Sequence, residues 1–198
     1  MQRDQAEHEG PPSRRRGPGR PASRSVEQVV DAAVVLLDRV GLDGVSMDGL
    51  ATELGSSRMG LYRYVDSKDH LLSLIPERLL TPVVGDVLAT ASGLAALRAV
   101  AAGVGAVLQL HPNAAPLLAR PEPGPQMQIA ARHAVALLIE DGAAAEEAFE
   151  MLRAVVAQVV GEHLTSHGGS SSLGVELVIE GIARRIGRGP IRWAGPEA

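Results

Sequence analysis

Four of the five serines from residue 25 to residue 67 constrain the fold of this chain most, because each of the four precedes a segment with helical spacing of apolar residues. A serine at the N-cap accepts a hydrogen bond from a backbone N–H of the first turn, and so marks where a helix begins. Gln28 completes a capping box with Ser25, and Gly41 stands where a glycine ends a helix. The pattern predicts helices over residues 26–40, 47–54, 58–65 and 68–80, capped by Ser25, Ser46, Ser57 and Ser67.

The chain as a whole is predicted to be all-α. Only 2% of its 198 residues are aromatic, and its apolar runs favour Ala and Leu over the β-branched residues of strands. Glycine and proline breaks, Pro82 among them, leave further helices near residues 85–91, 93–110, 113–119, 125–141, 144–165 and 173–187. We expect a flexible basic arm over residues 1–24, a helix-turn-helix domain over 25–75 and a second helical domain over 76–198.

The third predicted helix carries the groups that suit a DNA duplex. The short turns around it have the spacing of a helix-turn-helix, in which one helix enters the major groove. Leu61 and Val65 are expected to face inward. Arginines there can donate two hydrogen bonds to a guanine, and tyrosine hydroxyls can contact phosphates. The outward residues would be Arg58, Met59, Gly60, Tyr62, Arg63 and Tyr64, which include both tyrosines of the chain. The alternative is a helical hairpin with solvated side chains.

Residues 44–75, GVSMDGLATELGSSRMGLYRYVDSKDHLLSLI, resemble the DNA-binding domain of the tetracycline-repressor (TetR) family. The resemblance implies base contacts from Arg58, Met59 and Arg63. It also implies phosphate contacts from Tyr62, Tyr64 and Lys68, with Ser46 and Met47 touching the DNA backbone. Two positions depart from the family pattern: Gly60 stands where a small hydroxyl residue is usual, and Ser56 where an aliphatic residue is usual.

Positive charge is concentrated in the N-terminal arm. The net charge of the chain is −4, whereas residues 1–24 carry six arginines and three acidic residues. An extended Arg-Gly-Pro segment fits a narrow minor groove, which attracts arginine through its negative potential. Arg16 and Arg20 are therefore candidate DNA contacts. A solubilising tail is the alternative for this arm.

The family resemblance also implies a small-molecule effector and a homodimer. The candidate effector-binding residues lie in two predicted helices and the loop after one of them: Leu108, Gln109, His111, Met127, Gln128 and His133. Satisfied core or surface histidines are the alternative there. Two apolar stripes near the C-terminus are candidate dimer contacts, with burial inside the monomer as the alternative: Phe149, Leu152, Val156, Val159, Val160, Val178 and Ile182.

These expectations describe a repressor that binds a palindromic operator as a homodimer and is released by its effector. The fourth helix would couple the two domains, because it touches both.

Other functional classes receive little support from the sequence. The chain contains no cysteine, which excludes disulfides, thiolate nucleophiles and cysteine-bound zinc. Glu162, His163 and His167 are the most suggestive metal pattern, but their order differs from that of a metalloprotease helix. We therefore expect no enzyme activity, cofactor or metal. The acidic C-terminal part also disfavours an architectural DNA protein.

The chain is expected to be cytoplasmic, without a membrane segment. Its N-terminus is polar, unlike a signal peptide. The apolar stretch over residues 94–110 is interrupted by Arg98 and Gln109, which favours a buried helix over a membrane span.

Overall fold

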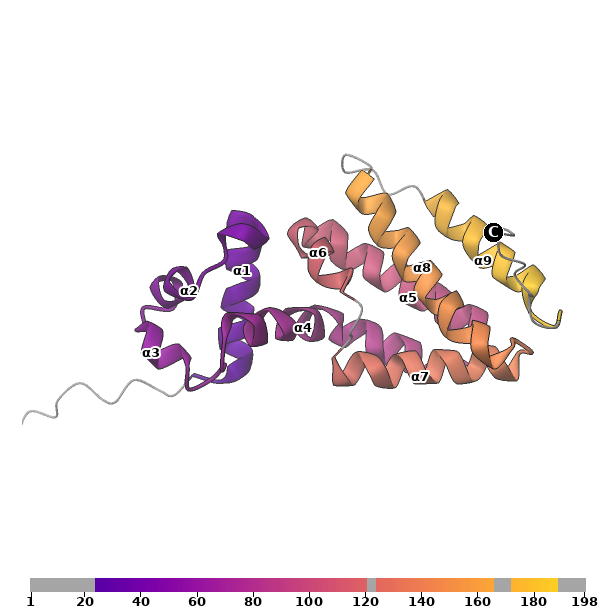
Figure 1. The fold of residues 1–198 in the computed structure, drawn as a ribbon, viewed down its shortest axis with the longest axis horizontal. Helices are drawn as coiled ribbons and strands as arrows, with labels where there is room; N and C mark the ends of the chain where they lie inside the picture. Colours follow the sequence, from indigo (N-terminus) through magenta and orange to yellow (C-terminus); the bar gives the residue numbers. More distant parts are fainter. Residues whose placement is uncertain (1–23, 121–123, 166–171, 189–198) are drawn as a thin grey trace, which may run out of the picture.

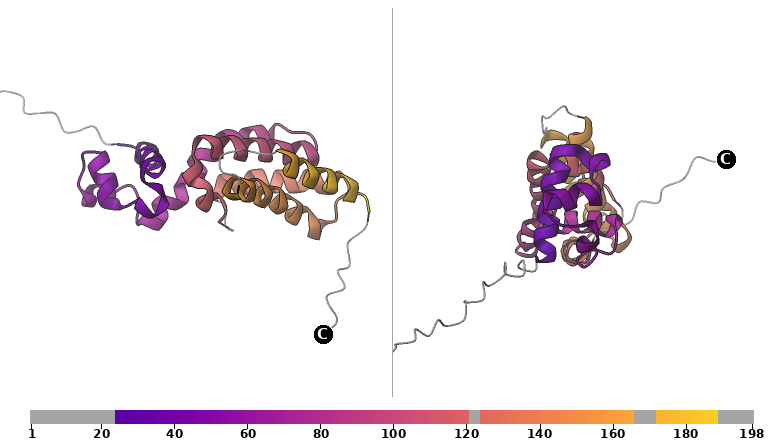
Figure 2. Two further views of the ribbon diagram at one scale, coloured as in Figure 1. Left: turned by 90° about the horizontal axis from the view of Figure 1, so that it is seen from above. Right: turned by 90° about the vertical axis from the view of Figure 1, so that its left-hand side faces the viewer.

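The computed structural model describes residues 24–120, 124–165 and 172–188, which form helices and turns without a strand. The all-α prediction is confirmed. Figures 1 and 2 show an elongated molecule with α1–α3 at one end, α5–α9 at the other, and α4 passing between them. The helices are α1 (Val26–Gly44), α2 (Met47–Glu53), α3 (Arg58–Leu61), α4 (Lys68–Leu88), α5 (Gly93–Leu110), α6 (Ala115–Leu118), α7 (Pro125–Glu140), α8 (Ala145–Thr165) and α9 (Ser172–Arg185), with a 3-10 turn at Pro112–Ala114.

All four predicted serine caps are confirmed. Each hydroxyl accepts a hydrogen bond from the backbone N–H three residues later, at 3.3 Å for Ser25, 3.0 Å for Ser46, 3.1 Å for Ser57 and 3.0 Å for Ser67. The Gln28 side chain returns a hydrogen bond to the Ser25 backbone and completes the capping box. Gly41 adopts a positive φ of 71°, as its predicted C-terminal position requires, and a short further helical turn follows it up to Gly44.

Helix α4 corrects the prediction of a break at Pro82. The structure has one helix of 21 residues through Pro76 and Pro82, where we expected two helices. A proline inside a helix costs about 3 kcal/mol, because it removes a hydrogen bond and crowds the preceding turn. Beyond Pro82, Val83 and Val87 are buried in the core, at about 1.5–3 kcal/mol for each side chain. This burial offsets the cost of Pro82.

Two hydrophobic cores meet along α4. The first joins α1, α2 and α3 to the first part of α4 as far as Ile75, and Ala114 and Leu117 close it. The second begins at Leu80 and continues through α5, α7, α8 and α9. The boundary that we place after residue 75 therefore lies inside a continuous helix. A displacement of α4 necessarily affects both cores.

Helix α5 lies in the middle of the second core. Its 18 residues have a mean hydropathy of 1.6, so by length and composition alone it could cross a membrane, despite Arg98 and Gln109. A core helix of a globular domain meets the same criteria. In the structure α5 packs against α4, α7, α8 and α9.

Close helix packing at Gly93 yields a prediction about stability. A Cβ atom added to Gly93 would lie 2.7 Å from Cα of Leu138, whereas one added to Gly105 of the same helix would meet nothing nearer than 4.0 Å. Gly93→Ala should lower the free energy of unfolding by about 1–3 kcal/mol, because α5 and α7 must separate. Gly105→Ala should leave it unchanged or raise it by up to about 1 kcal/mol. Urea denaturation measures both, and equal effects would contradict this packing.

Candidate nucleic-acid interface

The short helix α3 is held by its inward residues and by its cap. Leu61 has no exposed surface and Val65 is 1% exposed, so the prediction that both face inward is confirmed. The helix spans Arg58–Leu61, shorter than the predicted 58–65, and residues 62–64 continue as a turn. Four residues cannot hold a helix in water by themselves. The orientation of α3 therefore depends on the first core and on the Ser57 cap.

The opposite face of α3 is open to solvent. Met59 is 75% exposed, Tyr62 is 37% exposed, and Arg58 and Arg63 are also exposed. Tyr64 is half-buried and packs against the first core, so less of it faces outward than we expected. Helix α3 itself lies at one end of the elongated molecule, remote from α5–α9 (Figures 1 and 2).

The other predicted DNA contacts differ in how exposed their side chains are. Met47 is 5% exposed and packs inside the first core, so its assignment as a DNA-backbone contact is wrong. It follows the cap residue Ser46, and the turn of α2 that buries Leu50 also directs Met47 inward. Ser46 is exposed, and Lys68 is half-buried at the start of α4. Arg16 and Arg20 lie outside the described residues.

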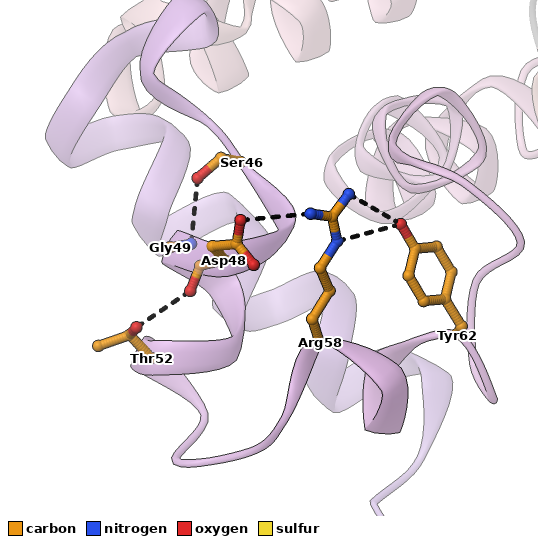
Figure 3. Close-up of polar contacts among 6 residues, drawn as sticks. All are labelled: Ser46, Asp48, Gly49, Thr52, Arg58 and Tyr62. Carbon is orange, nitrogen blue, oxygen red and sulfur yellow. Dashed lines mark hydrogen bonds and ion pairs between the residues drawn. The ribbon is translucent and has the colours of Figure 1, made fainter.

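Arg58 makes polar contacts on both sides, and Figure 3 shows them. Its Nη1 donates to Oδ2 of Asp48 in α2 at 3.4 Å, and its Nε and Nη2 donate to the Tyr62 hydroxyl oxygen at 3.4 Å each. The hydrogen bond to Tyr62, followed by the charge of Asp48, raises the pKa of Arg58 above its usual value. The contact between Arg58 and Asp48 joins α3 to α2.

Sequence reasoning missed Asp48. An acidic residue in the first turn of a helix is explained by the helix dipole alone, so its spacing carries no further signal. Its contact with Arg58, ten residues away, depends on how α2 and α3 pack.

Three polar contacts join the first helical unit to α4 and to the loop after α5. Arg78 of α4 donates to both carboxylate oxygens of Asp31 in α1, at 2.5 and 3.2 Å. His111 Nδ1 lies 2.8 Å from Oδ2 of Asp38. The Asn113 amide donates to the carbonyl oxygens of Leu37 and Asp38 at 3.1 and 3.0 Å, close to where α1 is interrupted.

A groove of about 570 Å³ lies between α1, α4 and α5. Val83, Val107 and Leu110 give it apolar walls, and charged groups line it as well. Those groups include the Asp31–Arg78 pair and Asp86. A molecule in this groove would touch both helical units at once.

Of the six predicted effector-binding residues, His111 lines this groove. Leu108 is 1% exposed in the second core, and Met127 packs against that core. His133 Nε2 lies 3.3 Å from the Thr90 carbonyl oxygen, while Gln109 and Gln128 are exposed. The groove residues from α1 and α4 were not found from the sequence, because it cannot show that these helices face α5.

The predicted dimer stripes belong largely to the monomer core. Leu152, Val159, Val160 and Ile182 are at most 8% exposed in the second core, and Val156 and Val178 pack partly buried against it. The assignment of the four buried residues to a dimer interface is therefore corrected. Phe149 is 47% exposed. Other large apolar side chains that are exposed on α8 and α9 are Leu164, Leu173 and Leu177.

The metal pattern at the end of α8 finds no support in the described part of the chain. Glu162 accepts a hydrogen bond from Gln158 at 2.8 Å, and His167 lies outside the described residues. Within residues 24–120, 124–165 and 172–188, no group of three His, Asp or Glu side chains could hold a metal ion.

Comparison with known proteins identifies the family of the helical unit that contains α3. Residues 29–75 match the family described as "Bacterial regulatory proteins, tetR family". The chain belongs to the tetR family. HTH-type transcriptional repressor DrrR1 of Streptomyces coeruleorubidus is 39% identical over 100 residues, 50% of this chain but 37% of that protein. The chain thus aligns with little more than a third of this curated relative.

Solved structures extend the likeness beyond the DNA-binding domain. A TetR variant from Acinetobacter baumannii AYE, crystallised with minocycline, superposes with a TM-score of 0.69 at 25% identity over 79% of this chain and 94% of that one. BioQ, solved with its natural double-stranded DNA operator, gives a TM-score of 0.64 at 19% identity over 81% and 99% of the two chains. At this low identity, the likeness to BioQ shows a shared fold alone.

The two departures from the tetR-family pattern lie against each other. A Cβ atom added to Gly60 would lie 2.8 Å from the Ser56 hydroxyl oxygen and 3.3 Å from that of Ser57. A side chain at position 60 would therefore require the Ser56 hydroxyl to rotate away.

Proposed function

We propose that this chain is a cytoplasmic transcriptional repressor that binds a palindromic DNA operator as a homodimer and leaves it when a small molecule binds. The observation that carries this proposal is the exposed face of α3, which the first core holds in one orientation. Membership of the tetR family, whose members regulate transcription, supports the class of function. The name of the DrrR1 relative supports repression.

DNA recognition follows from the side chains on α3. The major groove admits one helix, and an arginine that pairs with the N7 and O6 atoms of guanine discriminates against other bases by about 1–3 kcal/mol. Arg58 and Arg63 supply such groups, and the Tyr62 hydroxyl can reach a phosphate. BioQ, which shares this fold, was solved on its operator. We place α3 in the major groove and the start of α4, with Lys68, beside the DNA backbone.

Selection of duplexes from a random library tests this function. The wild-type protein should enrich a palindrome whose half-sites lie about one helical turn apart, roughly 34 Å. Arg63→Ala should weaken binding to the enriched duplex about tenfold, which corresponds to one lost guanine contact. Arg132→Ala, an exposed arginine on α7, serves as the matched control and should bind normally. No enrichment, or equal losses in both variants, would contradict the proposal.

We place the dimer interface on the exposed faces of α8 and α9. Phe149, Leu164, Leu173 and Leu177 there are between 47% and 65% exposed in the monomer. Burying such side chains stabilises an association by roughly 25 cal/mol per Å² of apolar surface. Two copies related by a two-fold axis would bring α8 and α9 of each protomer into one four-helix bundle.

Charge placed on this face should separate the protomers. Leu173→Glu combined with Leu177→Glu should give a monomer, because carboxylates would be buried against an apolar partner surface. Val35→Glu introduces a similar change at a 54% exposed site on α1 and should remain dimeric. Size-exclusion chromatography with light scattering measures the mass. A monomeric wild-type protein, or a dimeric double variant, would refute this interface.

We place the effector in the groove between α1, α4 and α5. A ligand there contacts α4 and the Asp31–Arg78 pair together, so a preference for one position of α4 would change the position of α3. The related TetR structure holds minocycline, which supports small-molecule binding in this fold. Coupling free energies of about 1–3 kcal/mol are typical of such systems.

A bulky side chain in the groove tests the position of the effector. Drug-sized compounds, minocycline among them, would be screened for those that raise the Tm of the wild-type protein and release the enriched duplex. Ala106→Trp fills the groove and should abolish both effects without weakening DNA binding. Ala102→Trp lies exposed on the same helix outside the groove lining and should retain them. A compound that acts equally on both variants would show that the effector binds elsewhere.

A further inference from the structure

Met59 is an apolar side chain on a face of α3 that otherwise carries polar groups. It is 75% exposed, whereas the exposed side chains around it belong to Arg58, Tyr62 and Arg63. It belongs to neither of the two cores. A single exposed methionine needs no explanation on an ordinary surface. On the face proposed to meet DNA, its direction and its chemistry determine what it can contact.

The direction of Met59 follows from the anchoring of Leu61. Successive residues of a helix point about 100° apart, so Met59, two positions before Leu61, points almost opposite to it. Leu61 has no exposed surface and lies in the first core. Gly60, between them, has no side chain that could cover Met59. The Met59 side chain is therefore directed away from the first core, the direction in which α3 would enter a major groove.

The two arginines lie on either side of Met59 in the sequence. The Arg58 guanidinium lies between Asp48 of α2 and the Tyr62 hydroxyl (Figure 3). Nε of Arg63 donates to the Gly60 carbonyl oxygen at 3.5 Å, so this side chain extends back along α3 to the residue next to Met59. A base edge that Arg63 reaches in the groove therefore lies close to Met59 as well.

A methionine side chain can recognise one feature of the major groove. Its thioether carries no charge and donates no hydrogen bond. The base edges there present hydrogen-bond donors and acceptors, and the 5-methyl group of thymine is the one apolar group among them. Burying a methionine against the amino group of cytosine or adenine would leave a donor unpaired, at a cost in free energy. The flexible, unbranched side chain can adjust to the position of a methyl group.

We propose that Met59 is a specificity-determining residue that reads the 5-methyl group of a thymine in each operator half-site. This inference rests on the proposed function, because it requires α3 in the major groove. It adds a thymine to the guanines that the arginines can read. Two simpler roles compete with it: a side chain that stays in solvent, and an apolar contact with a deoxyribose. Neither of them depends on the base.

Removal of single methyl groups from the DNA distinguishes these roles. In the palindrome enriched by the wild-type protein, each thymine of a half-site is replaced in turn by deoxyuridine, which lacks the 5-methyl group and keeps the same hydrogen-bonding groups. Fluorescence anisotropy gives the affinities of the wild-type protein, Met59→Ala and Met59→Leu at one salt concentration, because phosphate contacts depend strongly on salt. Val35→Ala trims an exposed apolar side chain of α1 and is the matched control. Thermal unfolding of each variant confirms that it is folded.

Deoxyuridine at one thymine position should weaken wild-type binding about fourfold in one half-site and about fifteenfold in both, the effect of one buried methyl group per half-site. Met59→Ala should bind the thymine duplex more weakly than the wild type does, and should bind the deoxyuridine duplex equally well. Met59→Leu should retain the dependence on the methyl group, because leucine is apolar and of similar volume. Val35→Ala should behave as the wild type does with every duplex.

A wild-type protein that binds every deoxyuridine duplex normally would overturn the proposal, and the affinity of Met59→Ala would then show whether the side chain contacts a sugar or stays in solvent. A dependence on the methyl group of the same size in Met59→Ala would assign the contact to another residue and overturn it as well. A wild-type protein that enriches no duplex would contradict the proposed function, and this inference with it. Enrichment together with either of the first two outcomes contradicts this inference alone.

Discussion

The burial of Leu61 against the first core is the interaction on which the DNA-binding surface depends. Helix α3 has four residues, far fewer than a helix needs for stability in water. Leu61 and the neighbouring Val65 fix its inward side, and the Ser57 hydroxyl satisfies a backbone N–H at its start. The outward direction of Arg58 and Arg63 is a consequence of this anchoring. Without it, the same side chains would sample many orientations and could not match the edges of particular bases.

The second feature of the structure is that α4 belongs to both cores. Ile75 lies in the core that supports α3, and Leu80 begins the core of the C-terminal helices. Arg78 lies between them and binds Asp31 of α1. Further along α1, the Asn113 amide binds two backbone carbonyl groups. Because packed cores resist gradual deformation, a shift of α4 would move α1 and α3 as a unit. This geometry gives a ligand in the adjacent groove a physical route to the DNA surface.

The sequence predicted the features that depend on local chemistry. Serine caps at Ser25, Ser46, Ser57 and Ser67 mark the starts of their helices, because a hydroxyl reaches only the backbone of its own first turn. The inward side of α3 followed from spacing in the same way. The continuation of α4 through Pro82 did not, since it depends on burial against α5 and α7, which are distant in sequence. Apolar stripes on α8 and α9 indicated burial but could not distinguish the monomer core from a partner. Met47, the groove and the Asp48–Arg58 contact likewise depend on how helices pack.

We propose that the exposed face of α3 contacts DNA and that α8 and α9 form the dimer interface instead. An NMR titration of the isotope-labelled protein with its enriched duplex shows directly which amides are affected by DNA. We expect the largest amide shifts at Arg58, Met59 and Arg63, with smaller ones at the start of α4 and none near Leu177. Shifts concentrated on α8 and α9, with α3 unaffected, would contradict the account.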